Sequence, residues 1–262
     1  MKQTSITPDL NAIPEQFRNL IENSAVYDSS CSPEAQVLYI DRDGGYYLKS
    51  ASKGTLQTEA KLTEYFHIRG LAAEVAAYST ENDRDWLLTT AVPGTDCTHA
   101  DVLSQPARLC DILAETLRSL HELSYADCPV QNRLETYFAT AEQNYHAGLF
   151  DASYCPAEYR FSTPQEAWIA VSQGKRLLKN DSLIHGDYCL PNIIFKNWNL
   201  SGFIDLGNGG VGDRHIDLFW GAWTLKRNLG TEAYRERFFD AYGRDRINFD
   251  ALRIVSAAET FG

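Results

Sequence analysis

The sequence lacks the signals of several protein classes. No run of apolar residues reaches the length of a membrane span, and residues 1–5 contain no apolar signal-peptide core. The six cysteines show no Cys-x-x-Cys spacing and no paired histidines, which argues against a zinc site or a disulfide framework. A net charge of -11 disfavours nucleic acid, because phosphate backbones bind basic surfaces. These absences predict a cytoplasmic globular protein with no membrane or nucleic-acid partner.

The length and hydrophobic content predict two lobes. A chain of 262 residues is long for one core, and a hydrophobic content of 44% is ample for burial. Alternating patterns predict strands at 35–40, 46–49 and 86–90, and a helix begins at 59–65. The expected first lobe, residues 1–93, is therefore built on an antiparallel sheet.

From Pro106 onward the apolar residues recur with the helical period of 3.6 residues. Apolar positions on one face of this first helix are Leu109, Ile112, Leu113, Leu117 and Leu120. Further helical stretches are expected at 164–178, 215–229, 231–242 and 248–261. The predicted class is α+β, with a mainly helical second lobe at residues 94–262 and a hinge near residues 91–94.

Asp187, Asn192 and Asp205 have the spacing that phosphoryl transfer requires. In protein kinases a catalytic Asp is followed five residues later by a magnesium-binding Asn, and a second metal-binding Asp opens an Asp-x-Gly turn. Strands expected at 193–195 and 202–204, joined by a turn at 196–200, place Asn192 and Asp205 at strand ends. A single Asp in a Gly-containing turn usually only shapes the chain, but three residues in register favour chemistry. Asp187 is predicted to accept the hydroxyl proton, and Asn192 and Asp205 to bind Mg²⁺.

Several segments together resemble the aminoglycoside 3'-phosphotransferases, which are kinase-like antibiotic phosphotransferases. These segments, in family order, are 120–121, 127–129, 185–192, 201–207 and 212–217. The resemblance runs from about Tyr46 to the last residue. It implies a two-lobed protein-kinase-like fold, ATP or GTP as phosphoryl donor with Mg²⁺, and an aminoglycoside acceptor phosphorylated on its 3'-hydroxyl, which would confer antibiotic resistance.

The nucleotide site is expected in the first lobe. Lys49 closes a predicted strand and Glu59 begins the following helix, an arrangement in which an ammonium binds phosphate and a carboxylate holds it in place. A lysine at the end of an exposed hairpin is otherwise simply solvated. By resemblance, Tyr47 stacks on adenine, and Thr90 and Val92 bind its edge through backbone groups. Tyr47 is equally compatible with packing inside the lobe.

Two other segments bear on the reaction. The resemblance assigns the phosphate-covering loop to residues 29–33, with Ser32 as a contact, although the loop is not glycine-rich. Asp213 and Asp217 begin the helix expected at 215–229, where carboxylates favour the amino end, so a structural role is predicted. Only seven residues separate Asp205 from Asp213, and the chain has no Ala-Pro-Glu sequence. This favours a small-molecule acceptor over a protein substrate.

The resemblance also assigns acceptor-binding residues. These are Asp151, Glu158, Asn208, Glu259 and Phe261. Asp151 and Glu158 lie in a thinned acidic loop, and Asn208 stands where an Arg is common. Glu259 is alternatively an exposed residue at the end of a helix.

The end of the sequence departs from the family pattern. Ala258 replaces a typical Asp, and Gly262 follows the Phe that is usually last. These departures bear on the affinity for an aminoglycoside and not on the phosphoryl transfer itself. Two alternative functions therefore remain open beside that of an aminoglycoside kinase. One is a kinase-like enzyme for another small hydroxylated metabolite or antibiotic, and the other is a catalytically silent nucleotide-binding protein.

Overall fold

The computed structural model describes residues 4–156, 159 and 161–262, which divide into two compact units. The first unit comprises the chain up to Asp96 together with Ile193–Gly207. The second comprises Cys97–Asn192 and Asn208–Gly262. No helix in these described ranges is long and apolar enough to span a membrane. The first unit is thus discontinuous in sequence, because a short segment returns to it directly after Asn192.

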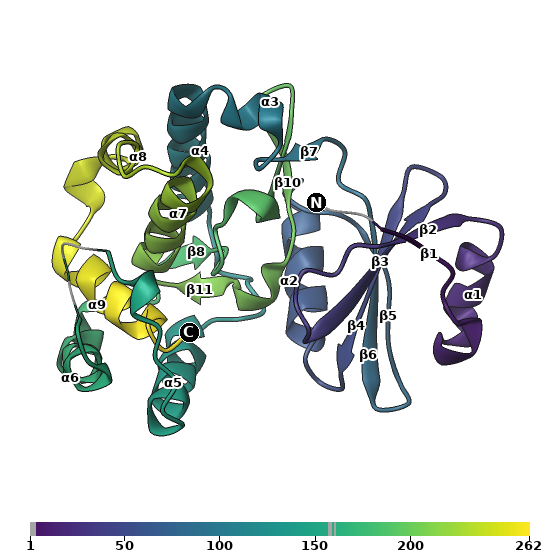
Figure 1. The fold of residues 1–262 in the computed structure, drawn as a ribbon, viewed down its shortest axis with the longest axis horizontal. Helices are drawn as coiled ribbons and strands as arrows, with labels where there is room; N and C mark the ends of the chain where they lie inside the picture. The colour runs from purple at the N-terminus through teal and green to yellow at the C-terminus, as the bar shows by residue number, and fades with distance from the viewer. Residues whose placement is uncertain (1–3, 157–158, 160) are drawn as a thin grey trace. The chain divides into compact units, whose positions relative to one another are not determined.

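An antiparallel six-stranded sheet dominates the first unit, in the order β1-β2-β3-β4-β6-β5 (Figure 1). Its strands are β1 (Thr4–Ile6), β2 (Ala25–Asp28), β3 (Ala35–Asp41), β4 (Tyr46–Ser52), β5 (Val75–Glu81) and β6 (Arg84–Thr90). The predicted strands at 35–40, 46–49 and 86–90 are confirmed. Strand β5 was not predicted, because its Ala, Ser and Thr residues produce little alternation of apolar and polar side chains.

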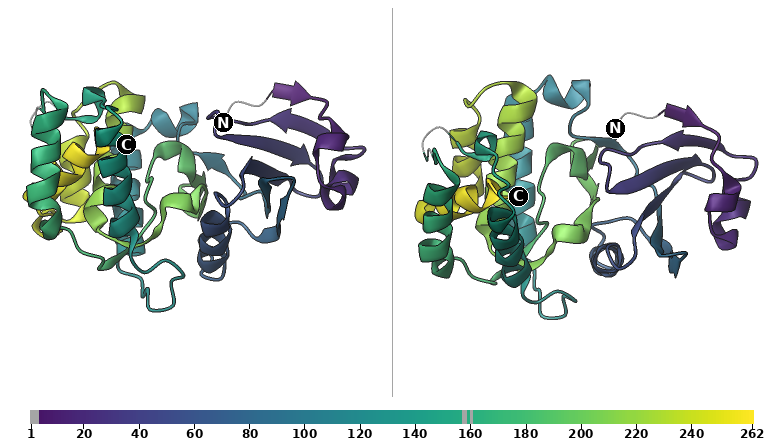
Figure 2. Two further views of the ribbon diagram at one scale, coloured as in Figure 1. Left: turned by 90° about the horizontal axis from the view of Figure 1, so that it is seen from below. Right: turned by 60° about the horizontal axis from the view of Figure 1, so that its bottom comes forward.

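Two helices cover opposite faces of this sheet, α1 (Glu15–Ile21) and α2 (Gln57–His67) (Figure 2). The core on the α1 face contains Ile13, Phe17, Ile21, Val26, Leu38, Ile40, Leu48, Trp86 and Leu88. The smaller cluster on the α2 face contains Ala51, Leu56, Ala60 and Leu87. Because side chains alternate along a strand, Lys49 shares the α2 face with Ala51. Lys49 lies in the middle of β4, so the prediction that it closes a strand is wrong.

A second, three-stranded sheet completes the first unit. Its strands are β7 (Thr95–Asp96), β9 (Ile193–Lys196) and β10 (Asn199–Phe203), in the order β10-β9-β7. Asn197 and Trp198, with φ of 53° and 64°, form the tight connection between β9 and β10. The predicted turn at 196–200 was therefore too long. With only two residues in the turn, Lys196, Asn199 and Leu200 remain paired in the strands.

The second unit is mainly helical, as predicted. Its helices are α3 (Ala100–Leu103), α4 (Pro106–His121), α5 (Arg133–His146), α6 (Pro164–Gly174), α7 (Arg214–Leu229), α8 (Arg235–Tyr242) and α9 (Phe249–Glu259). β8 (Ser182–Ile184) and β11 (Gly210–Gly212) form a two-stranded sheet, and the loop that begins at His185 directly follows β8. Helix α5 was not predicted. Only Leu134 and Ala141 of this helix are buried, which is too few for apolar residues to show a clear helical period.

Candidate active site

In the first unit, Lys49 is the centre of a cluster of charges. Its Nζ donates to both carboxylate oxygens of Glu59, at 3.0 and 2.9 Å, and to Oδ1 of Asp205 at 2.8 Å. Burial by itself lowers the pKa of Lys49, but the charges of Glu59 and Asp205 outweigh it and raise the pKa above its usual value. Lys49 is therefore a fixed cation with two carboxylate partners, and the alternative of a simply solvated lysine is wrong.

Asp205 has an unusual backbone conformation. Its φ is +57°, in the left-handed region that residues with a side chain seldom adopt. The side chain is half exposed, at 50%, and one of its oxygens contacts Lys49. The turn after β10 thus presents a partly solvated carboxylate next to a cation, although this backbone conformation is unfavourable.

The other predicted nucleotide residues lie on or beside the same sheet. Tyr47 is half-buried on β4, with its ring centroid 5.1 Å from that of Tyr39. The backbone N–H of Thr90 donates to the carbonyl of Glu74 at 3.0 Å, and its hydroxyl accepts from the backbone N–H of Glu74 at 3.1 Å. Val92 is half-buried in the segment that follows β6.

Ser32 is exposed in the connection between β2 and β3. That connection is ordered by its neighbours, since the hydroxyl of Ser30 accepts from the backbone N–H of Val37 at 2.9 Å. Ser32 thus lies on a short, hydrogen-bonded loop that joins two adjacent strands of the sheet.

In the second unit, Asn192 contacts Asp187 directly. The Nδ2 of Asn192 donates to Oδ2 of Asp187 at 2.8 Å and to its backbone carbonyl at 3.1 Å. Asn192 is 6% exposed, whereas Asp187 is half-buried. The carboxamide therefore orients a carboxylate that solvent and a substrate can reach, and the oxygen end of the carboxamide stays available as a ligand.

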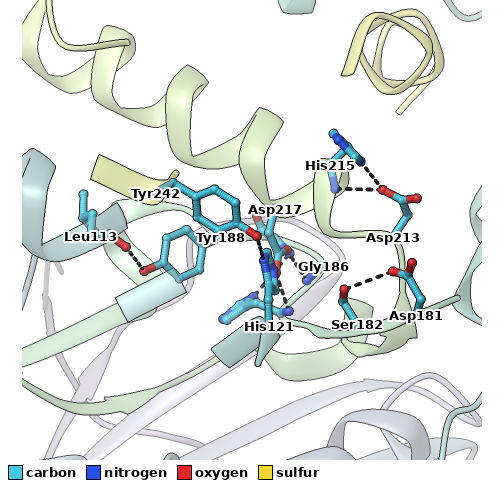
Figure 3. A network of polar contacts seen from close by, with 12 residues as sticks. Leu113, His121, Asp181, Ser182, Gly186, Tyr188, Asp213, His215, Asp217 and Tyr242 are labelled. Carbon is cyan, nitrogen blue, oxygen red and sulfur yellow. Dashed lines mark hydrogen bonds and ion pairs between the residues drawn. The ribbon is translucent and has the colours of Figure 1, made fainter. Parts of the chain in front are cut away.

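Asp217, from the first turn of α7, anchors the loop that carries Asp187 (Figure 3). Its Oδ2 accepts from the backbone N–H of His185, and its Oδ1 from that of Gly186, both at 2.7 Å. The Nε2 of His121 lies 3.1 Å from Oδ2. Asp217 is fully buried, so these contacts satisfy its oxygens where water does not. Sequence reasoning placed Asp217 correctly at a helix start but missed this link to the loop.

Gly186 allows the loop to make its turn. Its φ is +83°, and a Cβ at this position would lie 1.8 Å from the carbonyl oxygen of Asn208. A residue with a side chain would be excluded both by the backbone conformation and by this close approach. The His-Gly-Asp sequence thus requires glycine at its centre for steric reasons.

Glu259 is buried near the end of α9. It is 5% exposed, and its Oε1 accepts from the hydroxyl of Tyr137 at 2.9 Å. Burial raises the pKa of Glu259 to about 8, and the charge of Asp187 acts in the same direction, while hydrogen bonds from Tyr137 and Trp220 oppose it. The expectation of an exposed residue at a helix end is wrong, because α9 turns this side chain into the unit rather than toward solvent.

The remaining predicted acceptor residues have different surroundings. Phe261 is 1% exposed and packs against Tyr145 and Trp168. Asp151 is exposed, and its carboxylate accepts from the backbone N–H of Ser153 at 2.8 Å. Asn208 is also exposed. Glu158 lies outside the described residues.

Sequence reasoning missed two residues that bind Glu259. Tyr137 comes from α5, a helix whose pattern did not indicate its presence, and Trp220 comes from the middle of α7. No motif surrounds either residue, and both are more than 35 positions from Glu259 in the chain. Only a clear prediction of α5 and its buried face would have suggested Tyr137.

Comparisons with known proteins agree with this arrangement. The model of the phosphotransferase enzyme family matches residues 32–254. A probable aminoglycoside 3'-phosphotransferase from Lactococcus lactis is 48% identical over 254 residues, which cover 97% of each chain. An aminoglycoside 3'-phosphotransferase from Niallia circulans is 33% identical, over 68% of this chain and 67% of its own.

Solved structures show the same fold. Aminoglycoside phosphotransferase APH(3'')-Id from Streptomyces rimosus superimposes with a TM-score of 0.76 at 24% identity, covering 97% of this chain and 99% of its own. A structure of that protein also contains ADP and streptomycin. An aminoglycoside-3'-phosphotransferase of type VIII gives a TM-score of 0.74 at 23% identity, covering 97% of each chain. The predicted fold class is confirmed.

Proposed function

This chain belongs to the phosphotransferase enzyme family, in the group of the aminoglycoside 3'-phosphotransferases, and on that premise we propose that it phosphorylates the 3'-hydroxyl of an aminoglycoside antibiotic and so confers resistance. The phosphoryl donor is ATP or GTP. The observation that carries the reaction class is the contact between Asn192 and Asp187 on a loop anchored by Asp217. The relative that is 48% identical over nearly its whole length supports the acceptor class.

Asp187 is the general base of the proposed reaction. It accepts the proton of the acceptor hydroxyl while that oxygen bonds to the γ-phosphorus and the bond from phosphorus to the bridging oxygen breaks, which releases the nucleoside diphosphate. The hydrogen bond from Asn192 goes to Oδ2 of Asp187, and the half-buried carboxylate is open to the acceptor hydroxyl. Positioning of the hydroxyl, more than the basicity of the carboxylate, supplies most of the acceleration in such a site.

Asn192 and Asp205 are the proposed Mg²⁺ ligands. Both offer hard oxygen atoms, and Mg²⁺ takes few protein ligands and keeps several waters and phosphate oxygens. The half-exposed carboxylate of Asp205 and the carboxamide oxygen of Asn192 fit that requirement. Bound there, Mg²⁺ would neutralise charge on the phosphates.

Residues 1–93 form the proposed nucleotide-binding lobe. Lys49 binds the α- and β-phosphates, and Glu59 holds its ammonium in place. Tyr47 stacks on the base, and backbone groups of Thr90 and Val92 bind its edge. Ser32 covers the phosphates. The fixed positive charge of Lys49 is the strongest support for this assignment.

Residues 94–262 form the proposed catalytic and acceptor-binding lobe. The family resemblance assigns acceptor contacts to Asp151, Glu158, Asn208, Glu259 and Phe261. Of these, Glu259 has the best support, because it is a buried carboxylate whose pKa is influenced by Asp187. An acceptor ammonium beside it would favour its charged form. We place the enzyme in the cytoplasm, in keeping with six cysteines whose spacing indicates no disulfide framework.

One alternative acceptor class has a specific observation in its favour. A pKa of about 8 leaves Glu259 largely protonated at neutral pH until a cation approaches. The attraction for a polycationic drug would then be weaker. A less charged hydroxylated metabolite or antibiotic is therefore the second candidate acceptor. A silent nucleotide-binding protein has no observation in its favour.

The deciding experiment measures ADP or GDP release by purified protein with Mg²⁺, with and without a panel of 4,5- and 4,6-disubstituted aminoglycosides. Mass spectrometry then tests each drug for an added phosphoryl group. Drug-dependent release with a phosphorylated product supports the proposal. Release that no drug accelerates would redirect the search to other hydroxylated acceptors, and nucleotide binding without any turnover would favour the silent protein.

A further inference from the structure

Asp85 is a buried carboxylate to which the proposed reaction assigns no role. It lies at the start of β6 and is 0% exposed. Its Oδ1 accepts from the hydroxyl of Thr80 at 2.7 Å, and its Oδ2 accepts from the backbone N–H of Leu56 at 3.0 Å. A carboxylate so completely removed from water is stable only when its oxygens are hydrogen-bonded in this way. The contact with Leu56 connects the sheet to the start of α2.

Asp85 fixes the residue at the cap position of helix α2. The helix begins at Gln57, and the residue at its cap position, Leu56, has no side chain able to accept from the first turn. Asp85, on strand β6, instead accepts from the backbone N–H of Leu56 itself. Its hydrogen bonds, including one from the backbone of Gly54, hold its pKa below the usual value although burial opposes this. The negative charge also lies at the positive end of the helix dipole.

The strand register places Asp85 beside the phosphate-binding lysine. Asp85 pairs with Ala51 of β4, and Lys49 lies two residues earlier on the same strand. Residues two apart on a strand share a face, so Asp85, Ala51 and Lys49 all face α2. The small apolar cluster of Ala51, Leu56, Ala60 and Leu87 fills the space between that face and the helix.

Glu59 lies in the first turn of α2, which directly follows Leu56, the residue that Asp85 binds. The sheet therefore holds this turn at two points, through Asp85 at the backbone of Leu56 and through Lys49 at the side chain of Glu59. A shift of the helix start would move Glu59 relative to Lys49. The distances of 2.9 and 3.0 Å between their charged atoms leave little tolerance for such a shift.

We propose that Asp85 is a positioning residue of the nucleotide site, which fixes the first turn of α2 so that Glu59 holds Lys49 toward the phosphates. The proposal rests on the role proposed above for Lys49 and Glu59. It adds that the affinity for nucleotide depends on a carboxylate that touches neither the nucleotide nor the lysine.

The test compares Asp85→Asn with a control that destabilises the same unit elsewhere. Leu38→Ala opens a cavity in the core on the other face of the sheet, which is a cluster separate from that on the α2 face. For each variant, calorimetry measures the dissociation constant of ADP with Mg²⁺, thermal unfolding measures Tm, and steady-state kinetics measure the KM of nucleotide and of acceptor. We expect Asp85→Asn to weaken ADP binding about tenfold and leave the acceptor KM within about twofold. Leu38→Ala should lower Tm without changing ADP affinity.

A double-mutant cycle with Glu59→Gln separates positioning from general destabilisation. If Asp85 acts through Glu59, adding Asp85→Asn to Glu59→Gln weakens ADP binding less than about twofold further. Equal losses in both backgrounds, or an equal loss in Leu38→Ala, would overturn the proposal. Should Asp85→Asn not fold, Thr80→Val removes one donor to the same carboxylate and should weaken ADP binding in the same direction, by a smaller factor.

The outcomes also separate this proposal from the proposed function. ADP binding needs no acceptor, so a wild-type protein that binds ADP but phosphorylates no drug contradicts only the acceptor assignment. A wild-type protein that binds no nucleotide contradicts both. Tight ADP binding that is unchanged by Asp85→Asn contradicts the positioning role alone.

Discussion

The side-chain amide of Asn192 donates to Oδ2 of Asp187 across 2.8 Å. This contact ties a proposed metal ligand to the proposed base within one loop of the second unit. The carboxylate of Asp217 fixes the same loop, because it accepts hydrogen bonds from the backbone N–H groups of His185 and Gly186. The orientation of Asp187 thus depends on two side chains, one local and one from α7.

Asp187→Asn is expected to remove phosphoryl transfer while sparing nucleotide affinity. The carboxamide has nearly the same shape but cannot accept the hydroxyl proton, and a positioned base contributes about 10²–10⁴ in rate. The measurement is kcat with a drug substrate together with the dissociation constant of ADP, with the exposed Asp245→Asn as a control. A fall in ADP affinity as large as the fall in kcat would contradict the role of base.

Asp217→Asn is expected to lower both stability and kcat. One of its two oxygens becomes an NH₂ group, which leaves a buried backbone donor without an acceptor at a cost of about 1–3 kcal/mol. The loop that carries Asp187 should then lose its defined position. Urea unfolding and hydrogen exchange at His185 and Gly186 measure these effects. Unchanged protection of these two amides in the variant would argue against the anchoring role.

Asn192→Ala and Asp205→Asn should each increase the Mg²⁺ concentration needed for half-maximal activity. Each change removes one hard oxygen ligand or its charge, so about tenfold or more Mg²⁺ should be required. Titration of Mg²⁺ at saturating nucleotide measures the effect, with the exposed Asp43→Asn as control. Mg²⁺ curves that overlay the wild type would exclude these residues as ligands.

Glu259 should make the folded protein less stable as the pH rises. Its pKa of about 8 in the folded protein exceeds the unfolded value of about 4.3, so the folded state binds more protons between these pH values. Its contribution to the free energy of unfolding is present in full below about pH 4 and is lost as the pH rises through 8. At about 1.4 kcal/mol per pH unit between the two pKa values, the loss is about 5 kcal/mol at most.

Urea unfolding of wild type and Glu259→Gln at pH 5 and pH 9 tests this expectation. Glutamine carries no charge, so its free energy of unfolding should fall less over that interval than that of the wild type. The exposed Glu115→Gln serves as the matched control and should follow the wild type. Parallel pH dependence of wild type and Glu259→Gln would show that Glu259 titrates normally.

Tyr137→Phe should weaken acceptor binding and leave nucleotide binding unchanged. The hydroxyl of Tyr137 stabilises the ionised form of Glu259, so its loss raises the pKa of Glu259 further and makes the carboxylate less available to a cation. An increase of several-fold in acceptor KM at pH 7, shrinking toward pH 9, is expected. Tyr125→Phe is the control. An increase that does not depend on pH would point to altered packing instead.

The prediction of the fold was best where side-chain periodicity is strong. The amphipathic stretch from Pro106 became α4, and the alternating stretches around residues 35–49 became β3 and β4. Helix α5 and strand β5 went unrecognised, because each has few buried apolar residues and is held in place by its neighbours. The discontinuous first unit, with Ile193–Gly207 returning to it, has no signal in local sequence.

What the sequence determined by itself is the chemistry within the short motif. Asp187 and Asn192 are five residues apart, so one loop brings them together whatever surrounds it. The tertiary structure decided which distant groups complete the arrangement: Asp217 beneath the loop, Tyr137 on Glu259 and Asp85 on the helix of Glu59. Such partners are chosen by the packing of elements far apart in the chain, where a buried polar group must find a partner, and no local pattern specifies which one.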